Sequence, residues 1–153
     1  MANTYSQLYI HVVIVVKGRE SLITTHIRDD LYKYISGIIS NKNQKLLAIG
    51  GMPDHLHIFI SMNPDMKLSD LVRDIKANSS KWINENRFVK GKFNWQEGYG
   101  AFSYAKSQRD KVIKYIMNQE RHHHKKSFRE EYIDMLKKYD ISYAEKYLFN
   151  WIA

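Results

Sequence analysis

Two pairs of residues in the sequence have the types and spacing of a metal site beside a nucleophile. His55 and His57 are two positions apart, and side chains at this spacing on a β-strand point to the same face. Tyr115 and Gln119 are four positions apart, which places them on one face of a helix. If the two pairs converge, two imidazoles and an amide oxygen would surround a divalent cation, with a phenol about 6 Å away.

Such a site predicts a metal-assisted reaction on a phosphate group. Two imidazoles and a neutral amide bring no net charge, so they would leave positions on Mg²⁺ or Mn²⁺ for phosphate oxygens and water. Tyr115 becomes an effective nucleophile only when a nearby cation favours the phenolate, because the ordinary pKa of a phenol is about 10. We expect the metal, with Lys111 or Lys114, to supply that positive charge. The alternative interpretation of His55 and His57 is a hydrogen-bonded pair under a loop.

Helical geometry gives an expectation for the position of Tyr115. At about 100° per residue, Ile113, Ile116 and Met117 form a stripe that lies roughly 100 to 200° around the helix from Tyr115. We expect this stripe to be buried and Tyr115, together with Gln119, to lie outside it. The alternative is a surface tyrosine without a catalytic role.

The chain is basic, and its charge is concentrated in one segment. Its 153 residues include 24 Lys and Arg against 16 Asp and Glu, which gives a formal net charge of +8. Residues 106–129 hold eight basic and two acidic side chains, so this segment carries +6 of that total. The balance predicts a polyanionic partner whose phosphates contact the basic side chains. The candidate contacts are Lys106, Arg109, Lys111, Lys114, Arg121 and Lys125.

Length and composition narrow the class further. The chain has the length of one domain, which we expect to span residues 1–153. The lack of cysteine excludes disulfides, thiolate nucleophiles and zinc–thiolate sites, and it favours a cytoplasmic location. The apolar run at residues 8–16 is too short to cross a bilayer, so we expect no membrane partner.

The hydrophobic pattern predicts an α+β fold. Alternation predicts strands, and apolar residues at helical spacing predict helices, in the order strand, helix, strand, strand, helix, strand. This order is typical of a ferredoxin-like sandwich, an antiparallel sheet with helices on one face and the other face free. Leu56, Ile58 and Ile60 should face the helices, which places His55 and His57 on the open face. The expected strands are residues 5–16, 45–50, 55–62 and 101–105, and the expected helices are residues 22–39 and 68–86.

Two further helices are predicted after the last strand. Ser107, with Asp110 three residues on, is expected to begin a helix that runs to Arg121. Ser127 and Glu130 have the pattern of a capping box, and they are expected to begin the final helix. The apolar stripe of that helix is Phe128, Tyr132, Met135, Leu136 and Tyr139. Residues 122–124 are three histidines, for which phosphate or solvent contact, a metal ligand and a proton carrier are the alternatives.

Three segments, in this order, carry a resemblance to a known family. They are Asp54-His55-Leu56-His57; Trp95-Gln96 with Gly98-Tyr99-Gly100-Ala101-Phe102-Ser103; and Tyr115-Ile116-Met117-Asn118-Gln119-Glu120 with His122-His123. Together they resemble the single-tyrosine HUH transposases of bacterial insertion sequences and their repeat-associated relatives. The match runs from about Tyr9 to Tyr147. The chain departs from the family in its third consecutive histidine, His124, and in having no glycine between Ala105 and Tyr115, where a hinge is often found.

The resemblance implies a function as well as a fold. It implies a ferredoxin-like or RRM-like homodimer that acts on single-stranded DNA folded into hairpins at the ends of an element. His55 and His57 match the histidine pair, Gln119 the third metal ligand, and Tyr115 the nucleophile. In the family, the tyrosine forms a 5′-phosphotyrosine and frees a 3′-OH, and the reverse attack rejoins strands without ATP. Family members often complete each site with the tyrosine helix of the partner subunit.

Two alternatives remain open from the sequence. One is a non-catalytic RRM-like module that binds single strands by stacking bases on an open sheet face, which requires no metal. The other is a relative that no longer transposes and cuts chromosomal repeats instead. The DNA that flanks the gene would distinguish the second alternative from a mobile element.

Overall fold

A four-stranded antiparallel sheet forms the centre of the computed structural model, which describes residues 4–119 and 127–143. The strands lie in the order β2-β3-β1-β4, and every neighbouring pair is antiparallel. This is the ferredoxin-like order, so the predicted α+β class is confirmed. The bounds of the strands are β1 Tyr9–Val15, β2 Lys45–Met52, β3 His55–Ser61 and β4 Gly100–Tyr104.

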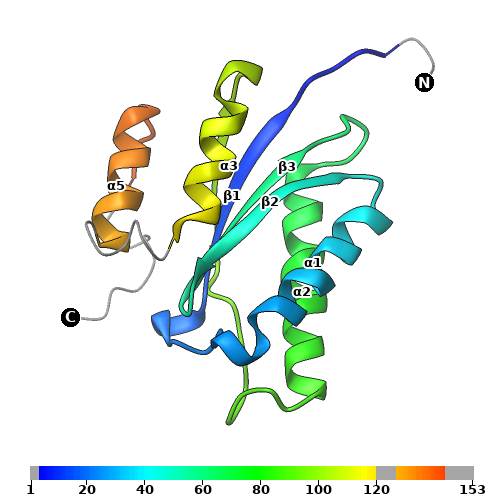
Figure 1. Cartoon of the computed structure of the whole chain (residues 1–153), viewed down its shortest axis with the longest axis vertical. Helices are drawn as coiled ribbons and strands as arrows, with labels where there is room; N and C mark the ends of the chain where they lie inside the picture. Colours follow the sequence, from blue (N-terminus) through cyan, green and yellow to red (C-terminus); the bar gives the residue numbers. More distant parts are fainter. Residues whose placement is uncertain (1–3, 120–126, 144–153) are drawn as a thin grey trace.

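Two long helices cover one face of the sheet. They are α1 (Thr25–Asn41) and α2 (Leu68–Glu85), and both follow a strand as predicted (Figure 1). Leu56, Ile58 and Ile60 of β3 are fully buried against them in the main hydrophobic core. The alternation of β3 therefore divides the strand as the sequence predicted, with its aliphatic residues toward α1 and α2.

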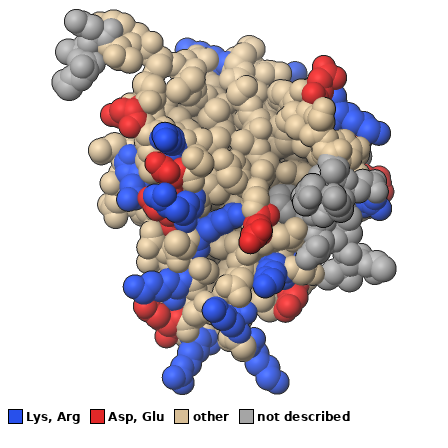
Figure 2. All heavy atoms as spheres, turned by 180° about the vertical axis from the view of Figure 1, so that it is seen from behind, with Lys and Arg blue, Asp and Glu red and all other residues tan. Residues whose placement is uncertain are grey.

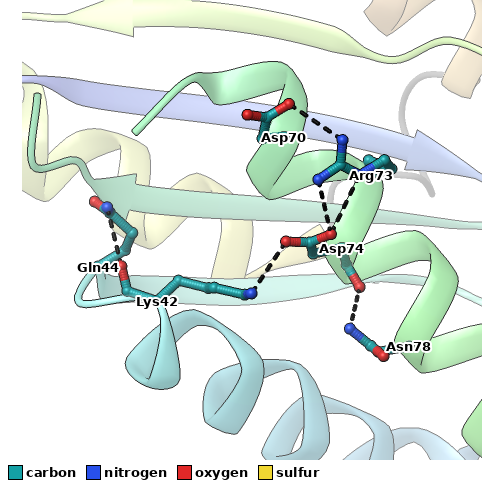
Figure 3. A network of polar contacts seen from close by, with 6 residues as sticks. All are labelled: Lys42, Gln44, Asp70, Arg73, Asp74 and Asn78. Carbon is teal, nitrogen blue, oxygen red and sulfur yellow. Dashed lines mark hydrogen bonds and ion pairs between the residues drawn. The ribbon is translucent and has the colours of Figure 1, made fainter. Parts of the chain in front are cut away.

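An ion-pair network joins α1 to α2. Asp74 on α2 accepts contacts from Lys42, at the C-terminal end of α1, at 3.2 Å and from Arg73 at 3.3 Å (Figure 3). The hydrogen bond from Lys42 is the main reason that the pKa of Asp74 lies below its ordinary value. This contact links the C-terminal end of α1 to the second turn of α2.

The opposite face of the sheet is also covered, which corrects the expectation of a free face. The short helix α3 (Arg109–Met117) and the helix α5 (Phe128–Lys138) lie on this side of the sheet (Figure 1). Val112 and Ile116 of α3 pack on Phe59 and Ala48 in one hydrophobic cluster. Phe128 of α5 belongs to another hydrophobic cluster, which packs on β1 and β4. The prediction was wrong because these two helices carry apolar stripes that must be buried, and the second sheet face is the surface available to them.

The predicted N-terminus is confirmed for α5 but not for α3. Ser127 is the N-cap of α5 as predicted, and its Oγ accepts a hydrogen bond from the backbone N–H of Glu130 at 3.2 Å. Ser107 is not a cap, because it lies inside a 3₁₀ turn, η2 (Lys106–Gln108), and α3 begins only at Arg109. A second 3₁₀ turn, η1 (Lys17–Arg19), follows β1. None of the helices in the described ranges combines the length and apolar character needed to cross a bilayer.

Candidate active site

The predicted histidine pair lies on the sheet face that α3 and α5 cover. His55 and His57 pair with Val15 and Val13 of β1, and their exposed fractions are 1% and 0%. Their side chains therefore share a face, as the i, i+2 spacing predicted, but that face is an interior rather than an open surface.

His57 contacts two residues that were not predicted as part of the site. Its Nδ1 lies 2.7 Å from Nε2 of His11 on β1, and its Nε2 lies 3.2 Å from a carboxylate oxygen of Glu131 on α5. Burial, followed by the adjacent His57, lowers the pKa of His11 well below its ordinary value, which favours the neutral form of His11. The contact occupies Nδ1 of His57 and directs its Nε2 toward α5.

The Nδ1 atom of His55 is also engaged, in this case by a carboxylate. Its Nδ1 donates to Oδ1 of Asp54 at 2.7 Å, and Arg19 binds the other oxygen of that carboxylate at 2.9 Å. Burial would raise the pKa of Asp54, but the hydrogen bond and charge of His55, with Arg19, outweigh it and lower the pKa. The His55 ring also stacks on Phe128, with centroids 3.8 Å apart. Both histidines thus have Nδ1 engaged, an arrangement that fixes the tautomer and orientation of imidazole metal ligands.

The donor atoms around the histidine pair fit a small divalent cation. One ligand atom each from His55, His57 and Glu131 lie within 4.8 Å of one another. Ligands about 2.1 Å from an octahedral ion are roughly 3.0 to 4.2 Å apart, so only a small contraction is required. The carboxylate oxygen suits both Mg²⁺ and Mn²⁺.

Tyr115 lies directly beside this cluster in the same chain. Its ring centroid is 5.7 Å from that of His57 and 6.3 Å from that of His11, in edge-on geometry. The Tyr115 hydroxyl is buried and interacts with the side chains of Glu131 and Gln119. The His55–His57 pair and the Tyr115–Gln119 pair therefore lie close together, as predicted.

The expected position of Tyr115 on its helix was wrong. The face of α3 that meets the sheet carries Val112 and Ile116, and the partly buried Tyr115 packs at its edge, whereas Met117 is 64% exposed. The expected stripe omitted Val112, and this shifted the buried side by about one residue. Gln119 lies two residues beyond the end of α3, is buried, and donates from Nε2 to the Tyr115 carbonyl at 3.3 Å.

The electrostatics around the phenol also differ from the expectation. Burial, and then the charge of the Glu131 carboxylate, raise the pKa of Tyr115 far above its ordinary value, while the hydrogen bond with Gln119 opposes this. Lys111 and Lys114 are exposed, so they do not offset the carboxylate. In the described structure the phenol is therefore protonated.

Glu131 and His11 are the site residues that the sequence analysis missed. Glu131 is 3% exposed, and it sits three residues after Phe128 and four before Met135, inside the apolar stripe of α5. An acid at a core position of an amphipathic helix is a signal that could have been read from the sequence. His11 could not have been assigned in this way, because its contact with His57 depends on β1 lying beside β3.

A cavity between α3 and α5 connects the basic side chains of α3 to the candidate site. Its volume is about 400 Å³, and its lining includes Lys111, Tyr115 and Glu131. Lys106, Lys111 and Lys114 are exposed, and Arg109 is partly exposed. On the face shown in Figure 2, basic side chains are interspersed with acidic ones rather than forming one uniform surface. Arg121, Lys125 and the histidines 122–124 lie outside the described residues.

The fold and the residues of the candidate site together define a class of protein. A ferredoxin-like sheet that holds a histidine pair beside a tyrosine is the arrangement expected of a single-tyrosine HUH transposase. The family model described as "Transposase IS200 like" matches residues 4–119, and the chain belongs to this family. Membership implies DNA cleavage and strand transfer.

Individual relatives agree with this assignment. The ISDra2 transposase TnpA of Deinococcus radiodurans is 24% identical over 118 residues, which cover 74% of this chain and 84% of that protein. A crystal structure of a candidate transposase from Deinococcus radiodurans R1 has a TM-score of 0.63 at 22% identity, covering 76% of this chain and 94% of that chain. A REP-associated tyrosine transposase bound to a REP hairpin has a TM-score of 0.56 at 17% identity, covering 76% and 68%. At these identities the two structures show the shared fold.

Proposed function

We propose that the chain is a tyrosine transposase, dependent on Mg²⁺ or Mn²⁺, that cuts and rejoins single-stranded DNA at hairpins at the ends of its element. The observation that carries this proposal is the position of the Tyr115 ring, 5.7 Å from His57, which belongs to a group of potential metal ligands in the same chain. Family membership supports DNA cleavage and transfer. The relative bound to a REP hairpin supports a hairpin substrate.

The proposed reaction is two successive transfers of one phosphoryl group. The phenol oxygen of Tyr115 forms a bond to phosphorus, and the bond from phosphorus to the 3′ oxygen breaks. The phenol loses its proton as this bond forms, and the electron pair of the broken bond leaves with the 3′ oxygen, which gains a proton and becomes a free 3′-OH, while the 5′ side remains on the tyrosine. A second 3′-OH then attacks the same phosphorus and displaces the phenol. One phosphodiester is consumed and one is formed, so no ATP is required.

The proposed division of labour follows from the positions of the side chains. His55 and His57, with Gln119 as a third ligand, would hold the ion, which when bound polarises the scissile phosphate. Asp54 and His11 would keep the two imidazoles oriented. Because burial and Glu131 keep the phenol protonated, attack requires that the surroundings of Tyr115 change when substrate or metal binds.

The basic residues near α3 are proposed to hold the DNA backbone. Lys111 lies closest to the reaction, because it lines the cavity that contains Tyr115. Such contacts supply affinity and register rather than chemistry. The proposed set remains Lys106, Arg109, Lys111, Lys114, Arg121 and Lys125.

Catalysis is proposed to occur within one chain. Tyr115 lies beside the histidines of its own subunit, which supports this proposal. The alternative, implied by the family resemblance, is a homodimer in which the tyrosine helix of the partner subunit completes each site.

A non-catalytic binder is less consistent with the fold. Stacking of bases on the sheet requires exposed aromatic side chains, but Phe59 is fully buried beneath α3. A repeat-cutting relative would use the same site and chemistry, so the sequence of the DNA beside the gene is the observation that distinguishes it.

The direct test is formation of a covalent adduct. Full-length protein with Mn²⁺ and single-stranded oligonucleotides from the DNA flanking the gene should give a detergent-resistant protein–DNA species. Tyr115→Phe should abolish it, whereas Tyr132→Phe, which alters a buried tyrosine of α5, should retain it. An undiminished adduct in Tyr115→Phe would refute the proposal.

A further inference from the structure

Glu131 is unusual for its place on α5. Phe128, Tyr132 and Leu136, on the same side of this helix, are buried in an apolar cluster against β1 and β4. Glu131 is 3% exposed and faces inward with them. Burying a carboxylate is costly unless charged or polar groups compensate it, so a carboxylate at this position calls for a specific role.

The carboxylate is aimed at the histidine pair. One of its oxygens lies 3.2 Å from Nε2 of His57, and its ligand atom lies within 4.8 Å of those of both His55 and His57. The Nδ1 atoms of the two imidazoles are already engaged, by Asp54 and by His11. The Nε2 atom of His57 is the one that faces Glu131.

We propose that Glu131 is a protein ligand of the catalytic metal, supplied by α5, in addition to the neutral ligands assigned above. The inference rests on the proposed metal-dependent function. Two imidazoles and an amide carry no charge and bind Mg²⁺ or Mn²⁺ weakly, whereas a carboxylate adds a charged, hard oxygen that both ions prefer. The Glu131 carboxylate could therefore bind either Mg²⁺ or Mn²⁺.

Ligation by Glu131 gives α5 a role beyond covering the sheet. The first turn of the helix is fixed by its Ser127 cap, and the backbone N–H of Glu131 donates to the Ser127 carbonyl at 3.0 Å. The helix therefore presents the carboxylate from a rigid, packed position. The metal affinity of this chain should therefore depend on α5 as well as on β3 and Gln119.

The test is a calorimetric titration of the full-length protein with Mn²⁺, without DNA. Glu131→Gln keeps the shape of the side chain and removes its charge, and it should weaken Mn²⁺ binding by about tenfold or more. Glu130→Gln is the matched control, because Glu130 is the exposed neighbouring acid on the same turn. It should change the affinity by no more than about twofold, since an exposed charge is screened by solvent.

The outcomes separate this inference from the proposed function. If His57→Ala abolishes binding while Glu131→Gln behaves like Glu130→Gln, the metal site stands and Glu131 is not a ligand. If His57→Ala leaves the affinity unchanged, the proposed metal site itself is wrong. Thermal melting of each apo variant, with and without Mn²⁺, shows whether the fold is retained, and a Mn²⁺-induced rise in Tm that is smaller in Glu131→Gln supports ligation.

Discussion

Gly50→Ala should dislodge the tyrosine helix from the sheet. Gly50 on β2 pairs with His57 on β3, and α3 crosses directly above it. A Cβ at this position would overlap the backbone carbonyl of Ile116, the residue after Tyr115. No rotamer change relieves a clash with backbone, so either α3 must move away or β2 must distort.

The size of the effect follows from this overlap. Overpacking costs about 1 to 3 kcal/mol, and a clash with backbone belongs near the upper value. For a chain of this size, about 3 kcal/mol corresponds to a fall in Tm of roughly 6 to 12 °C. A shift of Tyr115 by about 1 Å relative to the scissile phosphate should slow adduct formation by roughly 100-fold.

Two measurements on the same sample check this prediction. Circular dichroism gives the Tm, and the rate of adduct formation on a single-stranded oligonucleotide gives the activity. Gly37→Ala is the control, because a Cβ on Gly37 of α1 meets nothing within 4 Å. It should stabilise the helix by about 0.5 to 1 kcal/mol and leave the rate unchanged. A Gly50→Ala protein with wild-type Tm and wild-type rate would show that α3 does not pack on β2 in the way described.

Two further predictions concern the histidine pair and the basic helix. His11→Phe keeps an aromatic ring but removes the partner of His57 Nδ1, so Mn²⁺ affinity in calorimetry should fall roughly 10- to 100-fold with hairpin binding retained. An unchanged affinity would make His11 a packing residue only. Lys111→Ala and Lys114→Ala should each weaken hairpin binding and lower the slope of log K against log salt by about 0.7 in filter binding. Lys33→Ala, on the far side of the sheet, should not, and equal slopes in all three would count against the basic helix as the DNA contact.

The sheet and its first two helices could be predicted from the sequence because their patterns are local. Alternation in β3 separated Leu56, Ile58 and Ile60 from His55 and His57, and the structure keeps that division. The order of elements then left few antiparallel arrangements to consider. The covering of the second face could not be predicted in the same way, because it depends on how α3 and α5 pack across the chain.

The proximity of Tyr115 to the histidine pair could be predicted from the sequence, whereas the burial and charge around the phenol could not. The spacing of His55, His57, Tyr115 and Gln119 was sufficient to bring them together as a hypothesis. The position of the phenol was wrong, because a short helix offers few apolar residues and omission of Val112 changed the inferred buried side. Glu131 was overlooked because the apolar residues of α5 were counted and the acid among them was not.

The central claim is that Tyr115 carries the DNA as a 5′-phosphotyrosine. The most direct measurement is mass spectrometry of the trypsin-digested adduct, since cleavage after Lys114 and Arg121 releases a peptide of residues 115–121 with a single tyrosine. We expect this peptide to carry a nucleotide linked through its 5′ phosphate to Tyr115. A nucleotide on any other peptide, or linked through a 3′ phosphate, would contradict it.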